Sequence, residues 1–165
     1  MKSRLHKEIL ALLRENARIS NEKMAELLNV SVDEVEKVLN ELEKKKVIVC
    51  YTALTNPEID GSNQTTCLVE VKVTPQRGVG FDEIARRIYK YPEVKTCYLV
   101  SGTFDLLLEV EGENLKDIAN FVAQKLATLD HVLSTTSHFI LKKYKDNGII
   151  TTDEEEPPKR RPMTP

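Results

Sequence analysis

The chain has 165 residues, of which 41% are hydrophobic and 30% are charged, a balance typical of globular proteins. Its formal net charge of −2 excludes a basic field over the whole molecule, so any binding of nucleic acid must rest on local charge. No apolar run approaches the roughly 18 residues of a membrane span, and MKSRLHKEIL lacks the apolar core of a signal peptide, so we expect a cytoplasmic protein.

Three apolar patterns with helical spacing occupy the first fifty residues. Ser20 and Ser31 precede the second and third patterns as residues that favour a helix N-cap, and Asn29 can close the second. The defining apolar positions are Leu5, Ile9, Leu12 and Leu13; Met24, Ala25, Leu27 and Leu28; and Val35, Val38, Leu39 and Leu42. A tight turn joins the last two helices, so residues 1–50 are predicted to form a helix-turn-helix DNA-binding domain.

The third helix would be the recognition helix, yet SVDEVEKVLNELEKKK (31–46) is rich in acidic residues. DNA is a polyanion that is bound largely by lysine and arginine, so this composition needs an explanation. Ser31 and Glu34 fit the capping-box pattern, and Asp33 and Glu34 favour the positive end of the helix dipole. The remaining acids have i,i+4 partners available, Glu41 with both Lys37 and Lys45.

The face of this helix opposite its apolar stripe is less acidic than the sequence as a whole. At about 100° per residue it carries Asp33, Lys37, Asn40 and Lys44. Lysine contacts phosphate or guanine, and asparagine can pair with the N6/N7 edge of adenine. We therefore expect a helix that can enter a groove. The predicted DNA-binding residues are Arg18, Ser20, Asn21, Lys23, Ser31, Asp33, Lys37, Asn40 and Lys44.

The pattern changes after the third helix. VIVCYTA (47–53) is β-branched and aromatic, which predicts a strand, and TNPEIDGSN (55–63) is rich in turn formers. We assign residues 51–63 to a connecting strand and linker. The following domain, residues 64–145, has the order β-α-β-β-α-β, which predicts a ferredoxin-like antiparallel sheet with helices on one face and thus an α+β protein. Its predicted elements are strands at 65–74, 94–100, 104–110 and 131–144 and helices at 81–91 and 115–129.

A ferredoxin-like sheet with helices on one face leaves its other face uncovered. Dimerisation through that face is an economical way to cover it, and we hold this as a hypothesis. Residues 146–165 contain an acidic triplet, prolines and Lys159-Arg160-Arg161 with little to bury, so a flexible tail is expected.

The chain resembles the Lrp/AsnC, or feast/famine, family of transcription regulators from about Leu5 to Lys145. The resemblance is carried by ILALLRENARISNEKMAELLNVS, LEKKKVIVCYTALTNPEIDG, CYLVSGTFDLLLEV and STTSHFILKKYK. Its most specific pieces are Arg18-Ile19-Ser20 and the Gly102-x-x-Asp105 turn. The resemblance implies a helix-turn-helix domain joined to a regulatory domain, dimers that assemble further into octamers, and an amino acid or similar small effector that changes the grip on double-stranded DNA.

The resemblance also implies an effector pocket. Its residues would be Tyr98, Ser101, Gly102, Thr103 and Asp105, with Thr135 and Thr136 on the last strand as further candidates. Gly102 would supply the positive φ that a tight hairpin needs. Asp105 would accept hydrogen bonds from an ammonium group. The alternative is that the glycine and the aspartate merely stabilise a hairpin.

The recognition helix departs from the family in one respect. Family members are commonly rich in arginine where this chain has Lys37, Val38, Asn40 and Glu41. We therefore expect weak binding at a single site, strengthened when several sites are held in one oligomer. An effector-sensing protein of the same fold that has lost DNA binding is the alternative.

A tetrapyrrole decarboxylase with this two-domain architecture is a third hypothesis, for which His138, Arg86 and Arg87 are the candidates. No catalytic motif stands out, so we expect no enzymatic activity and no catalytic residue. The cysteines Cys50, Cys67 and Cys97 lack CxxC spacing, and no histidine has partners at metal-ligand spacing. No cofactor and no metal site is predicted, and Cys67 and Cys97 are expected in the core.

Overall fold

The computed structural model describes residues 4–56, 59, 61, 64–74 and 80–151. The predicted tail beyond residue 151, including Lys159-Arg160-Arg161, and the loop at 75–79 lie outside the described residues. The chain divides into two compact units, Met1–Thr55 and Asn56–Pro165. In the described part of the chain, no helix combines the length and the apolar composition needed to cross a membrane.

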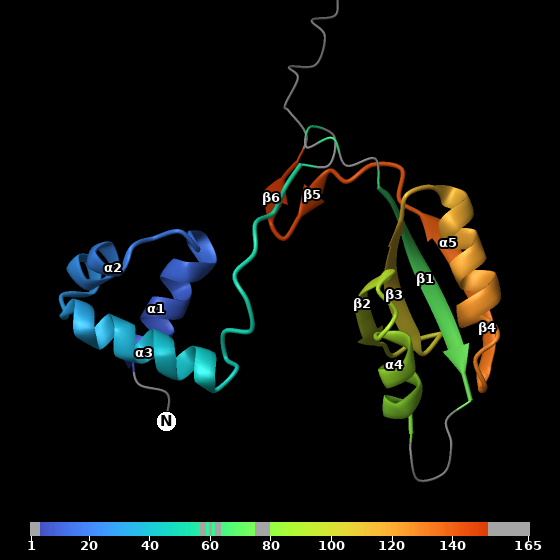
Figure 1. The fold of residues 1–165 in the computed structure, drawn as a ribbon, viewed down its shortest axis with the longest axis horizontal. Coiled ribbons are helices and arrows are strands. Elements are labelled where there is room, and N and C mark those ends of the chain that lie inside the picture. The colour runs from blue at the N-terminus through green and yellow to red at the C-terminus, as the bar shows by residue number, and fades with distance from the viewer. Residues whose placement is uncertain (1–3, 57–58, 60, 62–63, 75–79, 152–165) are drawn as a thin grey trace, which may run out of the picture. The chain divides into compact units, whose positions relative to one another are not determined.

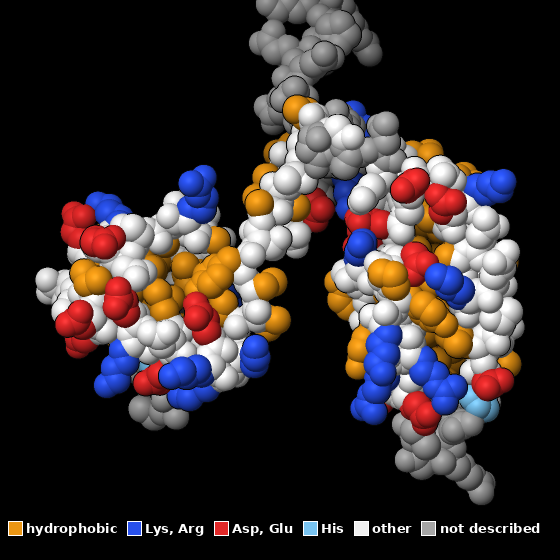
Figure 2. Space-filling view, viewed as in Figure 1, with side chains coloured by type: hydrophobic (Ala, Val, Ile, Leu, Met, Phe, Trp, Pro, Cys, Tyr) orange, Lys and Arg blue, Asp and Glu red, His pale blue; other side chains and the backbone are white. Residues whose placement is uncertain are grey.

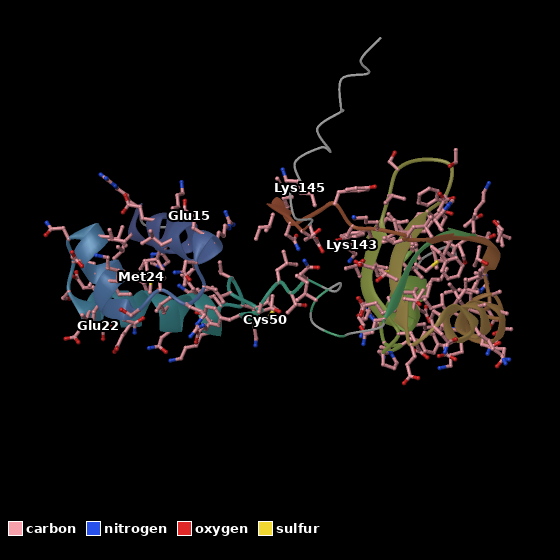
Figure 3. All side chains as sticks on the ribbon, turned by 90° about the horizontal axis from the view of Figure 1, so that it is seen from above. Glu15, Glu22, Met24, Cys50, Lys143 and Lys145 are labelled. Atoms are coloured by element: carbon pink, nitrogen blue, oxygen red, sulfur yellow. The ribbon has the colours of Figure 1, made fainter. Side chains whose placement is uncertain are left out.

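The N-terminal unit is a three-helix domain made of α1 (Arg4–Glu15), α2 (Asn21–Leu28) and α3 (Val32–Lys44). The predicted apolar stripes meet in one core, because each helix buries the face that carries its stripe. The buried residues are Ile9, Met24, Ala25, Val35, Val38 and Leu42. Met24 lies among the helices, whereas Glu22 points outward (Figure 3). The helix-turn-helix prediction is confirmed.

The predicted caps of α2 and α3 form as the sequence indicates. Asn29 ends α2 in the left-handed region with a φ of 52°, and its N–H donates to the α2 carbonyls of Ala25 and Glu26. Ser31 and Glu34 form the complete capping box at the start of α3. These caps fix the turn between α2 and α3, and so fix the direction in which α3 presents its polar face.

The strand predicted at residues 47–53 is wrong. In the structure α3 is followed by a turn in which the N–H groups of Val47 and Ile48 donate to the carbonyl of Leu42, and the chain then runs without regular structure to Asn56. β-Propensity alone does not make a strand, because a strand needs a neighbour with which to exchange hydrogen bonds. The side chains of Val49 and Tyr51 are exposed.

The second unit is a four-stranded antiparallel sheet with two helices, as predicted (Figure 1). The strand order is β2-β3-β1-β4, and the order along the chain is β-α-β-β-α-β. The elements are β1 (Thr65–Val73), α4 (Asp82–Ile88), β2 (Val94–Leu99), β3 (Leu106–Gly112), α5 (Leu115–Phe121), a π-helical turn η1 (Val122–Leu126) and β4 (Val132–Phe139). The ferredoxin-like α+β fold is therefore confirmed.

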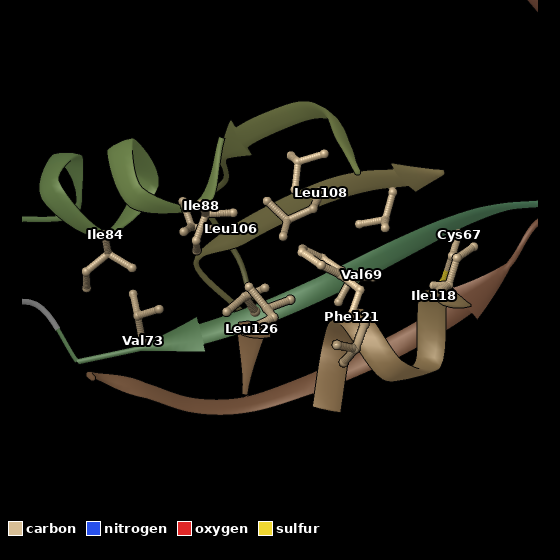
Figure 4. Packing of buried hydrophobic residues seen from close by; sticks show 14 residues of the cluster. Cys67, Val69, Val73, Ile84, Ile88, Leu106, Leu108, Ile118, Phe121 and Leu126 are labelled. Carbon is tan, nitrogen blue, oxygen red and sulfur yellow. The ribbon is translucent and has the colours of Figure 1, made fainter. Parts of the chain in front are cut away.

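The core of this unit lies between one face of the sheet and the two helices (Figure 4). β1 alternates between its two faces, so Cys67, Val69, Val71 and Val73 all point to the helical side. Their main partners across the core are Leu106, Leu108 and Val110 of β3, Ile84 and Ile88 of α4, and Ile118, Phe121 and Leu126 of the last helix. Burial raises the pKa of the Cys67 and Cys97 thiols. Cys67 lies in the core as predicted, whereas Cys97 is half-buried and packs against it.

The opposite face of the sheet carries a row of side chains on which α4 and α5 do not pack. The pairing register places Tyr98 of β2, Leu107 of β3, Glu70 of β1 and Thr136 of β4 in one row across it. His138 lies in the next row, and its Nε2 contacts Oε1 of Glu70 at 3.1 Å. We call this surface the open face.

Two turns differ from the predictions. Gly102 is not among the glycines with positive φ, and a broad loop replaces the tight hairpin, closed by a hydrogen bond from the N–H of Val100 to the carbonyl of Asp105. Beyond β4, the expected tail begins instead with a small hairpin of β5 (Lys145–Asp146) and β6 (Ile149–Ile150). Its turn is Asn147-Gly148, both with positive φ, a sequence that strongly favours hairpins.

Candidate nucleic-acid interface and effector region

The exposed side of α3 is a shallow hollow lined by charged and amide side chains. The residues that line it are Asp33, Glu36, Lys37, Asn40, Glu41 and Lys44. They lie opposite the buried Val35, Val38 and Leu42, so the core fixes the rotation of this face. The outer stripe expected from the sequence therefore exists, with the two glutamates on its flanks. Figure 2 shows basic and acidic side chains interspersed over the helix-turn-helix unit.

The charges on this face are not equally available. Glu41 is held by Lys45 at 3.1 Å and by His6 at 3.5 Å, and the hydrogen bond from Lys45 is the main cause that lowers its pKa. The predicted pair of Lys45 with Glu41 forms, whereas the predicted pair of Lys37 with Glu41 does not. Among the described residues, neither Lys37 nor Lys44 forms an ion pair. Both ammonium groups can therefore meet phosphate.

Two predicted DNA-binding residues have structural tasks. The hydroxyl of Ser20 accepts a hydrogen bond from the N–H of Lys23, and that of Ser31 accepts one from the N–H of Glu34. In return, the carboxylate of Glu34 accepts a hydrogen bond of 3.0 Å from the backbone N–H of Ser31, and this hydrogen bond lowers the pKa of the glutamate. Both serines position the ends of helices α2 and α3.

The remaining predicted DNA-binding residues lie at the start of α2 and just before it. Arg18 is exposed before the helix, and its N–H donates to the side chain of Asn16. Lys23 forms an ion pair with Glu26 at 2.8 Å, which reduces the charge it can offer. Asn21 donates from its side-chain amide to Glu36 of α3 at 3.4 Å, a contact that the sequence did not indicate because fifteen positions separate the two residues.

The residues of the predicted effector pocket gather only in part. Ser101, Gly102 and Thr103 are exposed in the loop between β2 and β3. Asp105 is half-buried at the end of this loop, where its Oδ2 accepts a hydrogen bond of 2.8 Å from the N–H of Val73. The carboxylate therefore ties the loop to the end of β1, a structural role that the sequence did not reveal.

Tyr98 lies apart from Thr135 and Thr136, and these two neighbouring threonines point to opposite faces of the sheet. Tyr98 is on the edge strand β2 and Thr136 is on the opposite edge strand β4, three strand spacings or about 14 Å away. Thr135 pairs with Val71 and points to the helical side, whereas Thr136 pairs with Glu70 on the open face. One site on either face can thus include only one of the two threonines.

The candidate residues of an enzymatic site do not converge. His138 is on the open face of β4, where it pairs with Glu70. Arg86 and Arg87 belong to α4, which packs on the other side of the sheet, and Arg87 pairs with Glu83 at 2.9 Å. Among the described residues, no group of three or more histidine, cysteine or acidic side chains could hold a metal ion.

A partly buried ion pair near the end of β4 also escaped the sequence analysis. Lys143, which follows β4, contacts Glu109 of β3 at 3.1 Å and Asp146 at 3.6 Å. Burial acts against the charged form of Lys143, but the bond to Glu109 and the nearby carboxylates raise its pKa overall. No local signal marks a pair whose members are 34 residues apart. The pair fastens the chain beyond β4 to the sheet (Lys143 is labelled in Figure 3).

Comparison with known proteins agrees with this architecture. Residues 66–150 match the family model for the Lrp/AsnC ligand binding domain, and residues 2–49 match the model for a winged helix-turn-helix DNA-binding domain. The HTH-type transcriptional regulator YugG of Bacillus subtilis is 47% identical over 90% of this chain and 92% of its own. The leucine-responsive regulatory protein of Escherichia coli is 29% identical, with 88% of each chain covered.

Solved structures extend the similarity. The transcriptional regulator NMB0573 of Neisseria meningitidis, solved in complex with L-Met, has a TM-score of 0.72 and 25% identity, covering 88% of this chain and 94% of that one. The matched family models span both structural units, and the regulator from Bacillus subtilis matches along nearly its entire length. The chain belongs to the Lrp/AsnC family of helix-turn-helix transcriptional regulators.

Proposed function

We propose that the protein regulates transcription by binding double-stranded DNA through the outer face of α3, under the control of an amino acid or a similar small effector. The observation that carries the proposal is the exposed stripe of Lys37, Asn40 and Lys44, set opposite a buried apolar face. Within the described residues, neither lysine of the stripe forms an ion pair. Lysine can neutralise phosphate and asparagine can pair with adenine. A cytoplasmic location and the absence of enzymatic activity belong to the same proposal.

A homodimer formed through the open face completes the sheet unit. Leu68, Leu107 and Tyr98 are apolar or aromatic groups on this face, and the pairs of Glu70 with His138 and of Glu109 with Lys143 lie among them. An isologous contact would cover these apolar groups in both copies. Two helix-turn-helix units in one particle would then bind with avidity, and assembly to an octamer would extend this effect.

The effector is proposed to bind near the loop that contains Ser101, Gly102 and Thr103. Asp105 holds one carboxylate oxygen against Val73, and its second oxygen can accept a hydrogen bond from an ammonium group. A related regulator was solved with L-Met, which favours an amino acid as the ligand class. Tyr98 and Thr136 would take part only in a site to which two subunits contribute, because they lie on opposite edges of one sheet.

The DNA-binding part is tested by fluorescence anisotropy with duplex from the protein's own promoter region, over a salt series and with a panel of amino acids. We expect tighter binding to this duplex than to a random one at every salt concentration, and a change in affinity with at least one amino acid. Equal binding to both duplexes would favour the alternative, an effector-sensing protein that has lost specific DNA binding.

The effector site is tested with Asp105→Asn, which removes the charge and keeps an oxygen to accept the hydrogen bond from Val73. We expect the variant to fold and to lose the amino-acid-dependent change in oligomer size measured by light scattering. Asp130→Asn, at an exposed position in the turn before β4, is the matched control. An unaltered response in Asp105→Asn would contradict the assignment.

A further inference from the structure

Two carboxylates of the proposed DNA-binding face, Asp33 and Glu36, have no ion pair among the described residues, whereas Glu41 is paired with Lys45. Asp33 lies in the first turn of α3, where the positive end of the helix dipole stabilises a negative charge, and Glu36 lies beyond that turn. Glu34, also in the first turn, belongs to the capping box. In the described part of the chain, no lysine, arginine or histidine pairs with Glu36. Its carboxylate lines the proposed DNA-binding face as a free negative charge.

A free carboxylate on that face weakens general binding to DNA, because it repels the phosphates of both strands. The repulsion is offset only where the carboxylate accepts a hydrogen bond from a base. The major groove offers two donors, the N4 amino group of cytosine and the N6 amino group of adenine. Adenine places the acceptor N7 beside its amino group, and guanine presents the acceptors N7 and O6. Cytosine is therefore the base that a carboxylate selects.

Asn21 restricts the orientation of Glu36. A carboxylate can only accept hydrogen bonds, so the 3.4 Å contact with Glu36 Oε1 fixes the side-chain amide of Asn21 with Nδ2 as the donor. One oxygen of Glu36 is thereby engaged between α2 and α3, and Oε2 is left to accept from a base. Because the contact joins two helices whose ends are capped, the carboxylate is held on a rigid support.

We propose that Glu36, held by Asn21, selects cytosine in the major groove. The carboxylate would increase the discrimination between base sequences and lower the affinity for DNA in general. The proposal rests on the proposed binding of DNA through α3. Lys37 and Lys44 on the same face offset part of the phosphate repulsion. Glu36 would both favour cytosine and disfavour guanine at the same position, since it accepts a hydrogen bond from the N4 amino group of cytosine and repels the two acceptors of guanine.

The test is selection of bound sequences from a randomised duplex library with the full-length protein, compared with Glu36→Gln and the control Glu15→Gln. Glu15 is an exposed glutamate at the end of α1 and does not line the α3 face. We expect the wild type and the control to select cytosine at one position of each half-site. Glu36→Gln should lose that preference by about tenfold and gain adenine, since glutamine pairs with the N6/N7 edge. It should also bind random duplex more tightly than either.

Asn21→Ala separates positioning from charge. It keeps the carboxylate of Glu36, so binding to random duplex should not tighten as it does in Glu36→Gln, while the preference for cytosine falls because Glu36 is no longer held. Retention of the cytosine preference in Glu36→Gln, or a wild-type site without any such preference, would overturn the inference and leave DNA binding intact. Absence of any DNA binding by the wild type would instead overturn the proposed function.

Discussion

The two units of this protein complete their cores differently. In the helix-turn-helix unit, the apolar stripes of three helices face one another, and the face that remains on α3 is polar. In the sheet unit, helices cover one face, whereas the open face keeps Leu68, Leu107 and Tyr98 outside the core. The apolar faces of the first unit are all packed against one another, and its remaining polar face is suited to DNA. The second unit keeps apolar groups on its open face, which the proposed homodimer would cover.

The largest expected effect comes from truncating a core residue in either unit. Leu42→Ala in α3 and Leu108→Ala in β3 each remove a buried side chain and should lower the free energy of unfolding by about 3 kcal/mol. Hydrogen exchange should show each loss within its own unit, because the two units have separate cores. Loss of protection in both units with either single substitution would contradict the comparison.

A charge placed on the open face should break the proposed dimer. Leu107→Asp puts a carboxylate in the middle of that face beside Glu70, so the desolvation of like charges opposes association. Light scattering should then report a monomer. Leu115→Asp is the matched control, because Leu115 is an exposed leucine on α5. A dimer that survives in Leu107→Asp would place the interface elsewhere.

A smaller effect should follow from removing the N-cap of α3. Ser31→Ala loses the hydroxyl that accepts from the N–H of Glu34, which should lower the stability of the helix-turn-helix unit by about 1 kcal/mol. Thermal unfolding and hydrogen exchange of α3 measure this loss. Exchange in the sheet unit should be unchanged, and an unchanged α3 would show that the cap carries no stability.

The smallest expected effects concern pH, and they differ in sign between the units. The pKa of Glu34 is lowered from 4.5, so its stabilising contribution is present above that value and is lost as pH falls through the folded pKa. The pKa of Lys143 is raised from 10.5, so its contribution is present below that value and is lost as pH rises through the folded pKa. Glu34→Gln and Lys143→Gln should flatten the acid and alkaline limbs of stability respectively. An acid limb unchanged by Glu34→Gln, or an alkaline limb unchanged by Lys143→Gln, would remove that residue from the account.

Local patterns predicted the parts of the fold that depend on local interactions. The three helical stripes, the capping box at Ser31 and the β-α-β-β-α-β order are all visible in residue spacing. The strand predicted at 47–53 failed because pairing depends on a distant neighbour that propensity does not reveal. The hairpin at Asn147-Gly148 carried a strong turn signal that the polar composition of the surrounding tail obscured.

The candidate site was predictable as a helix face and not as a set of contacts. Helical geometry placed Lys37, Asn40 and Lys44 together. It could not predict that Asp105 binds the N–H of Val73 or that Asn21 holds Glu36, because these contacts join residues that are distant in the sequence. Which charged side chains are already engaged within the protein is therefore visible only in the structure.

The central claim, that DNA meets the outer face of α3, is tested most directly by the salt dependence of binding. Lys37→Gln combined with Lys44→Gln removes the two ammonium groups that line that face, and Lys116→Gln on α5 serves as the control. Two lost phosphate contacts should make the slope of log K against log salt shallower by about 1.8 and weaken binding to every duplex. An unchanged slope and affinity in the double variant would mean that DNA is bound by another surface.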